Sequence, residues 1–280
     1  MTSSRSKVTL LFQNKPECVI NLPEWLLPLE KIRESGSMEN LAIVEVAGRD
    51  SIAAAIKYLE ANDITDLLPT YVYTGTEYGP WGSVKDAVER LSLCLPNVIV
   101  HDLVVLGSPK FFKALNGRFI GELNSRFEFY TPCIGCHLYL HSVRIPLAVS
   151  LGNVPVIAGE RELHDERIKI NQTRETLNLY QSLFYEFNIQ FQLPIRKIDQ
   201  GKDVTKLLGF EWKEGEKQLG CVLSGNYRTV DGNVNIRIEQ ITKYLKEFAI
   251  PCAKKIIKAY IDGYIPDHIS IAREILETSE

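Results

Sequence analysis

From residue 41 onward, the chain alternates between two patterns of hydrophobic and polar positions. Short, nearly continuous runs of β-branched and other apolar residues are typical of strands buried on both faces of a sheet. Between these runs, apolar residues recur every three or four positions, which predicts amphipathic helices. The predicted strands cover residues 41–46, 70–75, 97–105, 154–159 and 191–198. The predicted helices cover residues 51–62, 84–94, 110–123, 136–151 and 173–187, with a kink expected at Pro146.

This alternation of strands and helices predicts an α/β fold, built on a parallel sheet with flanking helices. Ligands of such sheets bind beyond the carboxyl ends of the strands. The site is therefore expected where four turns follow strands, at residues 46–51, 74–79, 106–109 and 159–165.

Two smaller regions flank the alternating part of the chain. Residues 1–38 predict a short lead-in of strands and a helix, and residues 39–234 hold the α/β domain. Residues 235–280 predict a helical C-terminal tail. Its helices are expected at residues 236–248, 251–261 and 268–277.

Composition narrows the class of protein. With 280 residues, of which 45% are hydrophobic and 24% charged, the chain is neither disordered nor collagen-like nor a coiled coil. No apolar run approaches the roughly 18 residues of a transmembrane helix, and no signal peptide is visible after residues 1–7. We therefore expect a cytoplasmic protein without a membrane partner. The 32 basic and 35 acidic residues give a net charge of −3, so any nucleic-acid contact must come from a local patch.

The turn after the first predicted strand, at residues 46–51, has the residue types of a phosphate site. A helix N-terminus offers unpaired N–H groups and the positive end of its dipole. Gly48 permits a close backbone approach, Arg49 is suited to pair with a phosphate oxygen, and Asp50 is suited to hold Mg²⁺. The turn lacks the Gly-Lys-Ser/Thr ending of the Walker pattern. Taken alone, it fits a phosphate site and a helix capped by Asp50 or Ser51 equally well.

Three of the six cysteines form the second candidate site. Cys133 and Cys136 make a C-x-x-C pair, and Cys221 lies in a segment with glycines that could reach back to it. A [4Fe-4S] cluster with one open iron, a structural Zn²⁺ completed by His137 or His141, and redox or packed thiols are all compatible with this set. Covalent haem, which also uses C-x-x-C-H, is not expected without an export signal.

In order and spacing, the turn, the C-x-x-C pair and the distant cysteine resemble the PP-loop ATP pyrophosphatases, in particular their iron–sulfur-dependent tRNA-thiolation branch. The resemblance runs from about residue 41 to residue 228. Gly48, Asp50 and Ser51 match the family's Ser-Gly-Gly-x-Asp-Ser loop, whereas Val46 and Ala47 replace its first Ser and first Gly. In that branch, two close cysteines and one far downstream hold a [4Fe-4S] cluster.

The resemblance implies an adenine-nucleotide α-hydrolase-like (Rossmann-like) sheet and a two-stage reaction. ATP, with Mg²⁺, adenylates a carbonyl oxygen of the substrate and releases pyrophosphate, and a sulfur nucleophile then displaces AMP. The implied catalytic residues are Asp50, Cys133, Cys136 and Cys221, and the three cysteines are the implied metal ligands. The implied nucleotide-binding residues are Ala47, Gly48, Arg49, Asp50, Ser51, Thr74, Gly75, Thr76, Gly159, Glu160, Arg161 and Asp165.

The acceptor of the sulfur is open between two classes. Basic residues interleaved with aromatic ones cluster at residues 108–130 and 242–260, where they offer a surface for a tRNA. The slightly acidic chain suits a small-molecule acceptor equally well. A homodimer is expected from the branch. The substituted loop, together with Zn²⁺ on the cysteines, also fits a nucleotide-binding module without catalysis.

Overall fold

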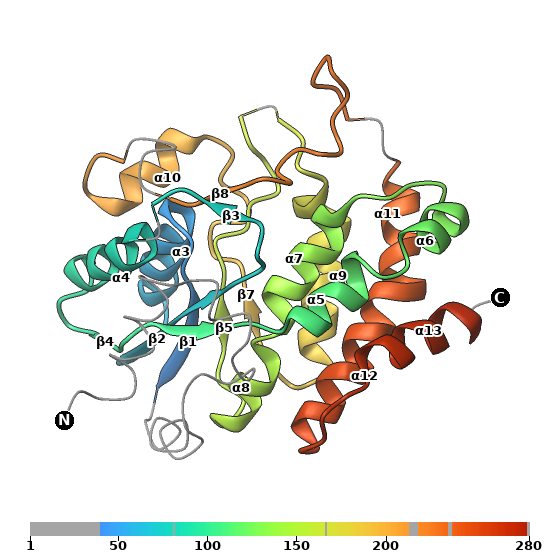
Figure 1. Ribbon diagram of the computed structural model, residues 1–280. Helices are drawn as coiled ribbons and strands as arrows, with labels where there is room; N and C mark the ends of the chain where they lie inside the picture. Colours follow the sequence, from blue (N-terminus) through green and yellow to red (C-terminus); the bar gives the residue numbers. More distant parts are fainter. Residues whose placement is uncertain (1–39, 81, 166, 213–217, 235–236, 279–280) are drawn as a thin grey trace.

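The computed structural model describes residues 40–80, 82–165, 167–212, 218–234 and 237–278, which form the predicted α/β fold (Figure 1). The lead-in predicted for residues 1–38 lies outside the described residues. Among the described residues, no helix is long and apolar enough to cross a membrane.

A six-stranded sheet runs through the middle of the molecule, with the strand order β4-β2-β1-β6-β7 and β5 paired to β2. Every pair of its strands is parallel, which confirms the predicted class. The strands are β1 (Leu41–Glu45), β2 (Asp66–Val72), β4 (Ile99–Val100), β5 (Val104–Leu106), β6 (Val156–Ile157) and β7 (Phe191–Gln192).

The second strand differs most from its prediction. β2 starts at Asp66, four residues before the predicted start at residue 70, and includes Pro69. Proline in a central strand normally removes a ladder hydrogen bond. Here the predicted strand at 97–105 is instead two short strands, and Pro69 lies between the residues of β2 that pair with β4 and those that pair with β5. A missing N–H therefore breaks no ladder at that point.

Helices cover both faces of the sheet (Figure 1). On one face, α3, α4 and α10 enclose a cluster rich in alanine and aliphatic side chains. On the other face, α5 to α9 and the C-terminal helices enclose a larger cluster rich in aromatic side chains. These helices are α3 (Arg49–Leu59), α4 (Gly82–Cys94), α5 (Pro109–Asn116), α6 (Ile120–Phe127), α7 (Pro132–Ser142), α8 (Ile145–Ser150), η2 (Ile170–Gln172), α9 (Arg174–Tyr185), α10 (Gly201–Leu208), α11 (Ile238–Tyr244), η3 (Leu245–Ala249), α12 (Ile250–Ile261) and α13 (His268–Thr278).

Several predicted helix and strand bounds were wrong for identifiable reasons. The helix predicted at 110–123 is α5 and α6, separated at Gly117. The helix predicted at 136–151 begins four residues earlier, at Pro132, where the hydroxyl of the N-cap Thr131 accepts the Cys133 N–H, and it divides before Pro146 into α7 and α8. The strand predicted at 191–198 ends at Gln192, since Pro194 follows two residues later and has no N–H to donate.

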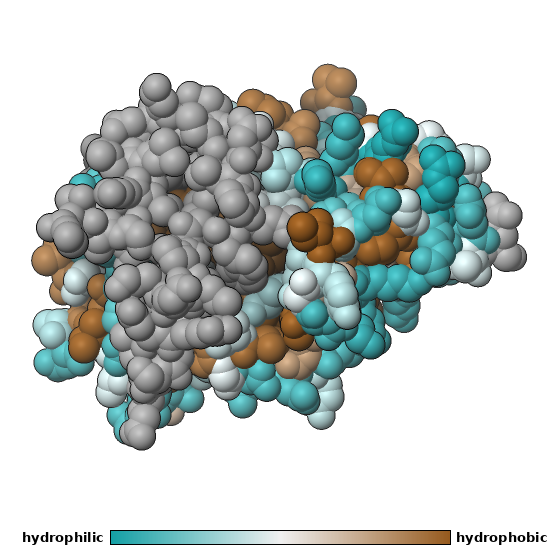
Figure 2. All heavy atoms as spheres, turned by 60° about the horizontal axis from the view of Figure 1, so that its bottom comes forward, coloured by the Kyte–Doolittle hydropathy of each residue, from teal (hydrophilic) through white to brown (hydrophobic). Residues whose placement is uncertain are grey.

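The C-terminal helices pack directly on the helices of the larger cluster. α11, the π-helical turn η3 and α12 follow one another without a break from Ile238 to Ile261, although two separate helices were predicted. α13 packs on α5 and α12. Figure 2 shows that hydrophilic residues predominate on the described part of one face of the molecule, with small hydrophobic patches among them.

A small second sheet brings a distant segment over the carboxyl end of the main sheet. β3 (Glu77–Tyr78) pairs antiparallel with β8 (Gly220–Cys221). A Cβ at Gly220 would lie 2.5 Å from the exposed Tyr78 ring, so a larger residue at this position would displace that ring. The loop that carries Cys221 is thereby held beside the end of β2 (Figure 1).

Candidate functional site

A cavity of about 830 Å³ opens at the carboxyl ends of β1, β2 and β6. Three of the four predicted turns contribute to its wall, together with α7 and residues 218–221. The prediction for the fourth turn was wrong, because the described residues 106–109 do not line the cavity. Ser108 is instead buried, caps α5 and donates its N–H to the Tyr139 hydroxyl.

The turn after β1 is closed by its own hydrogen bonds. The hydroxyl of Ser51 accepts from the N–H groups of Ala47 and Gly48, both at 3.1 Å, and donates to the Gly48 carbonyl at 2.7 Å. Gly48 is the N-cap of α3, and Ser51, the third residue of the helix, bonds back to it as in a capping box, which is close to the capping role that one of the two sequence interpretations expected. The same turn still lines the cavity, so the capping role and a role toward a ligand are not exclusive.

The carboxylate of Asp50 lies between two buried guanidinium groups. Arg49 Nε is 2.8 Å from one carboxylate oxygen, and Arg161 Nε is 2.9 Å from the other. Arg161 also donates to the Asp199 carbonyl at 2.6 Å, which fixes its position. Residues predicted as nucleotide ligands from two different turns therefore meet at one carboxylate. The pair of arginines places two positive charges at the start of α3, where phosphate binding is favoured.

Two glycines allow the segments around this turn to approach closely. A Cβ at Gly159 would lie 2.5 Å from backbone atoms of Asp50 and Ser51, so the end of β6 touches the start of α3 directly. A Cβ at Gly48 would lie 2.6 Å from the Gln218 side chain, which covers the turn from the other side. Asp165 accepts from the Gly201 N–H at 3.2 Å and so ties the cavity wall to the start of α10.

The end of β2 contributes hydroxyl groups. Thr74 Oγ1 and Thr76 Oγ1 lie 2.8 Å apart, and Glu77 accepts the N–H groups of Thr74 and Gly75. Thr76 Oγ1 lies 3.2 Å from the sulfur of Cys221. Thr74 and Thr76 line the cavity, whereas Gly75, with a φ of 83°, shapes the turn without lining it.

The three candidate cysteines come together beside this cavity. Cys136 and Cys221 line it, and all three line a second cavity of about 510 Å³. Cys133 lies in the first turn of α7, where its sulfur is 3.2 Å from Asn226 Oδ1 on the loop that follows Cys221. Burial raises the pKa of Cys133 and raises that of Cys136 further, and repulsion among the three thiols adds to both effects.

The spacing of the three sulfurs bears on what they could hold. The described cysteines are all free of disulfides. Among the described residues, the set of three or more Cys, His, Asp or Glu ligand atoms within 4.8 Å of one another is His137, His141 and Glu160, so the three sulfurs are spread more widely. A single tetrahedral Zn²⁺ needs sulfurs about 3.8 Å apart. At least one pair of the three sulfurs is more than 4.8 Å apart, which is wider than this spacing.

Sequence reasoning missed several residues of the cavity wall. Glu45 at the end of β1, Arg144, His164 and Lys169 all line the cavity. Glu45 is the last residue of a nearly continuous apolar strand, and nothing in that pattern indicated a site. Arg144 is buried and donates to Thr70 Oγ1 at 2.7 Å. Only the fold brings these residues to one place.

Comparison with known proteins gives a relative and a structural neighbour, while no protein-family model matches the chain. The chain is 39% identical over 253 residues to "Uncharacterized protein MJ0009" of Methanocaldococcus jannaschii, a match that covers 88% of this chain and 90% of the relative. Among solved structures, it is similar to the U34-tRNA thiolase NcsA from Methanococcus maripaludis with its [4Fe-4S] cluster. That similarity has 13% identity and a TM-score of 0.37, and it covers 89% of this chain and 78% of the other.

Proposed function

The chain belongs to the family of the Methanocaldococcus jannaschii protein MJ0009, and we propose that it is an ATP-dependent sulfurtransferase of the PP-loop type that uses a [4Fe-4S] cluster. One observation carries the proposal: Cys136 and Cys221 line the same cavity as residues 47–51 at the carboxyl end of β1. The turn at residues 47–51 and two cysteines that are distant from it in sequence thus share one space.

The nucleotide half of the site supports ATP as the co-substrate. The start of α3 and the guanidinium groups of Arg49 and Arg161 supply positive charge for the phosphates. Asp50 is the carboxylate available to Mg²⁺ once phosphate oxygens engage the two arginines. In the first stage, a carbonyl oxygen of the acceptor attacks the α-phosphorus, and pyrophosphate leaves.

The cysteine half supports the cluster. Cys133, Cys136 and Cys221 would hold three of its irons, and the spread of their sulfurs is wider than one Zn²⁺ requires. When bound, the cluster would present sulfide as the nucleophile that replaces AMP on the acceptor. Asn226 and Thr76 position Cys133 and Cys221 through contacts of 3.2 Å each. Cys136 is buried, whereas Cys133 and Cys221 are half-buried.

The acceptor is proposed to be a tRNA. Lys110, Lys113 and Arg118, from the first predicted basic cluster, gather around one surface pocket of about 390 Å³. The second cluster supports it less, because Lys254 pairs with Glu186 and Lys255 with Glu274. This loss of free positive charge favours a small-molecule acceptor as the second candidate.

The test is an anaerobic reaction of the reconstituted full chain with Mg²⁺-ATP, sulfide and bulk tRNA. Pyrophosphate and AMP are measured together with thiolated nucleosides by mass spectrometry. We expect Asp50→Asn to lose pyrophosphate release, and Cys221→Ser to keep it but to lose thiolation. Cys94→Ser is the matched control, because Cys94 lies on α4 outside both cavities. Thiolation that survives Cys221→Ser, or ATP that stays intact with the wild-type protein, would contradict the proposal.

A further inference from the structure

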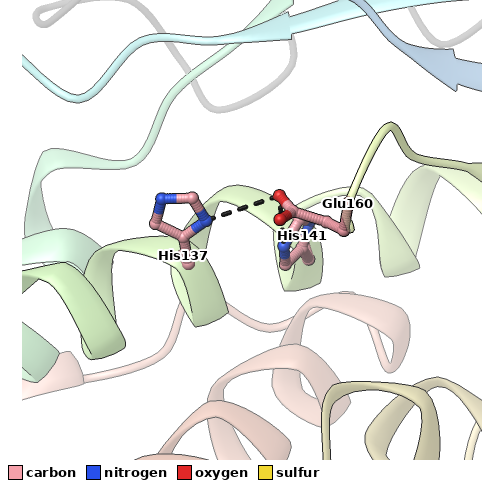
Figure 3. A group of neighbouring side chains, drawn as sticks. All are labelled: His137, His141 and Glu160. Atoms are coloured by element: carbon pink, nitrogen blue, oxygen red, sulfur yellow. Dashed lines mark ion pairs between the residues drawn. The ribbon is translucent and has the colours of Figure 1, made fainter. Parts of the chain in front are cut away.

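A second group of ligand atoms converges in the cavity wall, separate from the cysteine sulfurs. His137 and His141 lie one turn apart on α7, and Glu160 follows β6. Figure 3 shows both rings facing the Glu160 carboxylate. Glu160 Oε1 lies 3.5 Å from His137 Nδ1 and 3.4 Å from His141 Nε2. All three side chains border the cavity of about 830 Å³.

Three of the converging atoms lack a hydrogen-bond partner in the part of the chain that the structure describes. Among the described residues, none makes a hydrogen bond to His137 Nδ1, His141 Nε2 or Glu160 Oε2, although all three atoms are buried. Burying such atoms without a hydrogen bond is unfavourable. Most buried polar atoms in proteins are satisfied, so three orphaned atoms in one place point to a missing ligand.

The separations fit a metal ion better than direct contact. A metal–nitrogen or metal–oxygen distance of about 2.0–2.1 Å in tetrahedral geometry separates neighbouring ligand atoms by about 3.4 Å. The observed separations of 3.4 and 3.5 Å agree with this value. Two imidazoles and one carboxylate form a common protein ligand set for Zn²⁺ and Fe²⁺, and they leave a coordination position open.

The group also has the supporting contacts of a metal site. His141 Nδ1 lies 2.9 Å from Glu45 Oε2, which orients the ring so that Nε2 faces Glu160. Glu45 is held in turn by Arg144 at 3.3 Å. The rings of Tyr180 and Phe191 pack against His141, with centroids 5.2 and 4.9 Å away.

We propose that His137, His141 and Glu160 bind a divalent transition-metal ion, Zn²⁺ foremost, with the remaining coordination position turned to the nucleotide cavity. This site is distinct from the cysteine site, and it stands or fails independently of sulfur transfer. A metal here would bind an oxygen or sulfur atom of whatever occupies the cavity.

A buried ion-pair cluster is the rival arrangement. Burial lowers the pKa of His141, but the carboxylates of Glu45 and Glu160 outweigh it and raise the pKa to about 9. A protonated His141 between two carboxylates would leave the group without a metal. The experiment must therefore separate metal binding from ion pairing, and also from binding by the cysteines.

Titration of the full-length, metal-free protein with Co²⁺ under anaerobic conditions makes both distinctions. Nitrogen and oxygen ligands give visible d–d bands without the near-ultraviolet sulfur-to-cobalt charge transfer of thiolates. We expect one such Co²⁺ per chain, which Zn²⁺ displaces. Glu160→Gln and His137→Gln are expected to weaken this binding at least 100-fold. His101→Gln is the matched control, because His101 pairs with the carboxylate of Asp66 at the opposite end of β2.

A further variant, Cys133→Ser with Cys136→Ser and Cys221→Ser, is expected to keep the nitrogen–oxygen bands. Bands that persist in Glu160→Gln but vanish with the cysteines would overturn the proposal. Wild-type protein that shows no nitrogen–oxygen bands at millimolar Co²⁺ would overturn it as well and would leave the ion-pair cluster. Iron and sulfide content, measured separately, reports on the cysteine site alone, so the two failures are distinguishable.

Discussion

The helices α3 and α7 begin at the same end of the sheet, but their polar groups differ in how far the protein supplies them with partners. At the start of α3, the Ser51 hydroxyl takes up two backbone N–H groups, and Asp50 is matched by two arginines. On α7, two histidines present buried nitrogens that make no hydrogen bond within the part of the chain that the structure describes. Both helices line one cavity.

This contrast between α3 and α7 indicates which of the two helices needs a bound ligand. A turn that satisfies its own donors is stable without a ligand and can exchange one, as a co-substrate site must. Buried ligand atoms that face one another without partners are costly until something binds them. We therefore expect the ligand that exchanges during the reaction at α3 and the groups that stay bound at α7. Four substitutions bear on this contrast between α3 and α7, and they are taken in order of decreasing effect.

The largest effect is expected at the contact between β6 and α3. Gly159→Ala places a Cβ 2.5 Å from backbone atoms of Asp50 and Ser51, so the two segments must separate. Overpacking against backbone predicts a loss of about 3 kcal/mol in the free energy of unfolding, measured by urea titration. Gly121→Ala on the exposed face of α6 meets no atom within 4 Å and should change little. Equal stability of both variants would mean that β6 and α3 are not in contact.

Removing the charge at Asp50 comes next. Asp50→Asn leaves Arg49 and Arg161 buried without their shared carboxylate, for an expected loss of about 2 kcal/mol. Asp203→Asn is the control, because Asp203 pairs with Lys206 at the exposed surface. Added pyrophosphate should restore part of the stability of Asp50→Asn by pairing with the arginines. No such rescue in thermal unfolding would argue against a phosphate site at α3.

The next test, with an effect of similar size on stability, is the pH dependence of unfolding at His268, which does not line the cavity of about 830 Å³. Burial lowers the pKa of His268 on α13 to about 4, assisted by Lys110 and opposed by Asp267, and the ring contacts the Tyr260 hydroxyl. The folded pKa lies below the unfolded value of about 6.5, so the contribution to stability is present above pH 6.5 and lost as pH falls toward 4. At pH 5 the loss should be about 2 kcal/mol.

His268→Asn isolates that contribution. Between pH 7.5 and pH 5, the wild-type protein should lose about 2 kcal/mol more stability than the variant does. Parallel pH curves for the two proteins would show that His268 is not buried as a neutral ring.

The smallest change tests the cap. Ser51→Ala removes the hydroxyl that accepts from Ala47 and Gly48, for an expected loss of about 1 kcal/mol. If the turn also binds phosphate, the affinity for ATP falls in the same variant, as measured by calorimetry. A cap without any ligand role predicts the stability loss with no change in nucleotide affinity.

The sequence predicted what local patterns encode. The parallel sheet and the turn after β1 follow from periodicity along the chain, and the proximity of Cys221 to the C-x-x-C pair was expected from the family resemblance. The need for glycine at position 135 is not visible in the sequence, because Gly135 lies inside α7, where a Cβ would come 2.6 Å from the Tyr244 hydroxyl of α11. His137 and His141 were candidates to complete a Zn²⁺ site with the cysteines, but their convergence on Glu160 was not predicted, because Glu160 lies on another element and meets the histidines only through the fold.

The most direct test of the account is the iron, zinc and acid-labile sulfide content of the anaerobically purified protein. The account predicts about four irons and four sulfides per chain for the wild-type protein and for Cys94→Ser, and a large loss of both in Cys221→Ser. Zinc that disappears in Cys221→Ser, with no sulfide in the wild-type protein, would contradict it. So would the absence of iron and sulfide after anaerobic reconstitution.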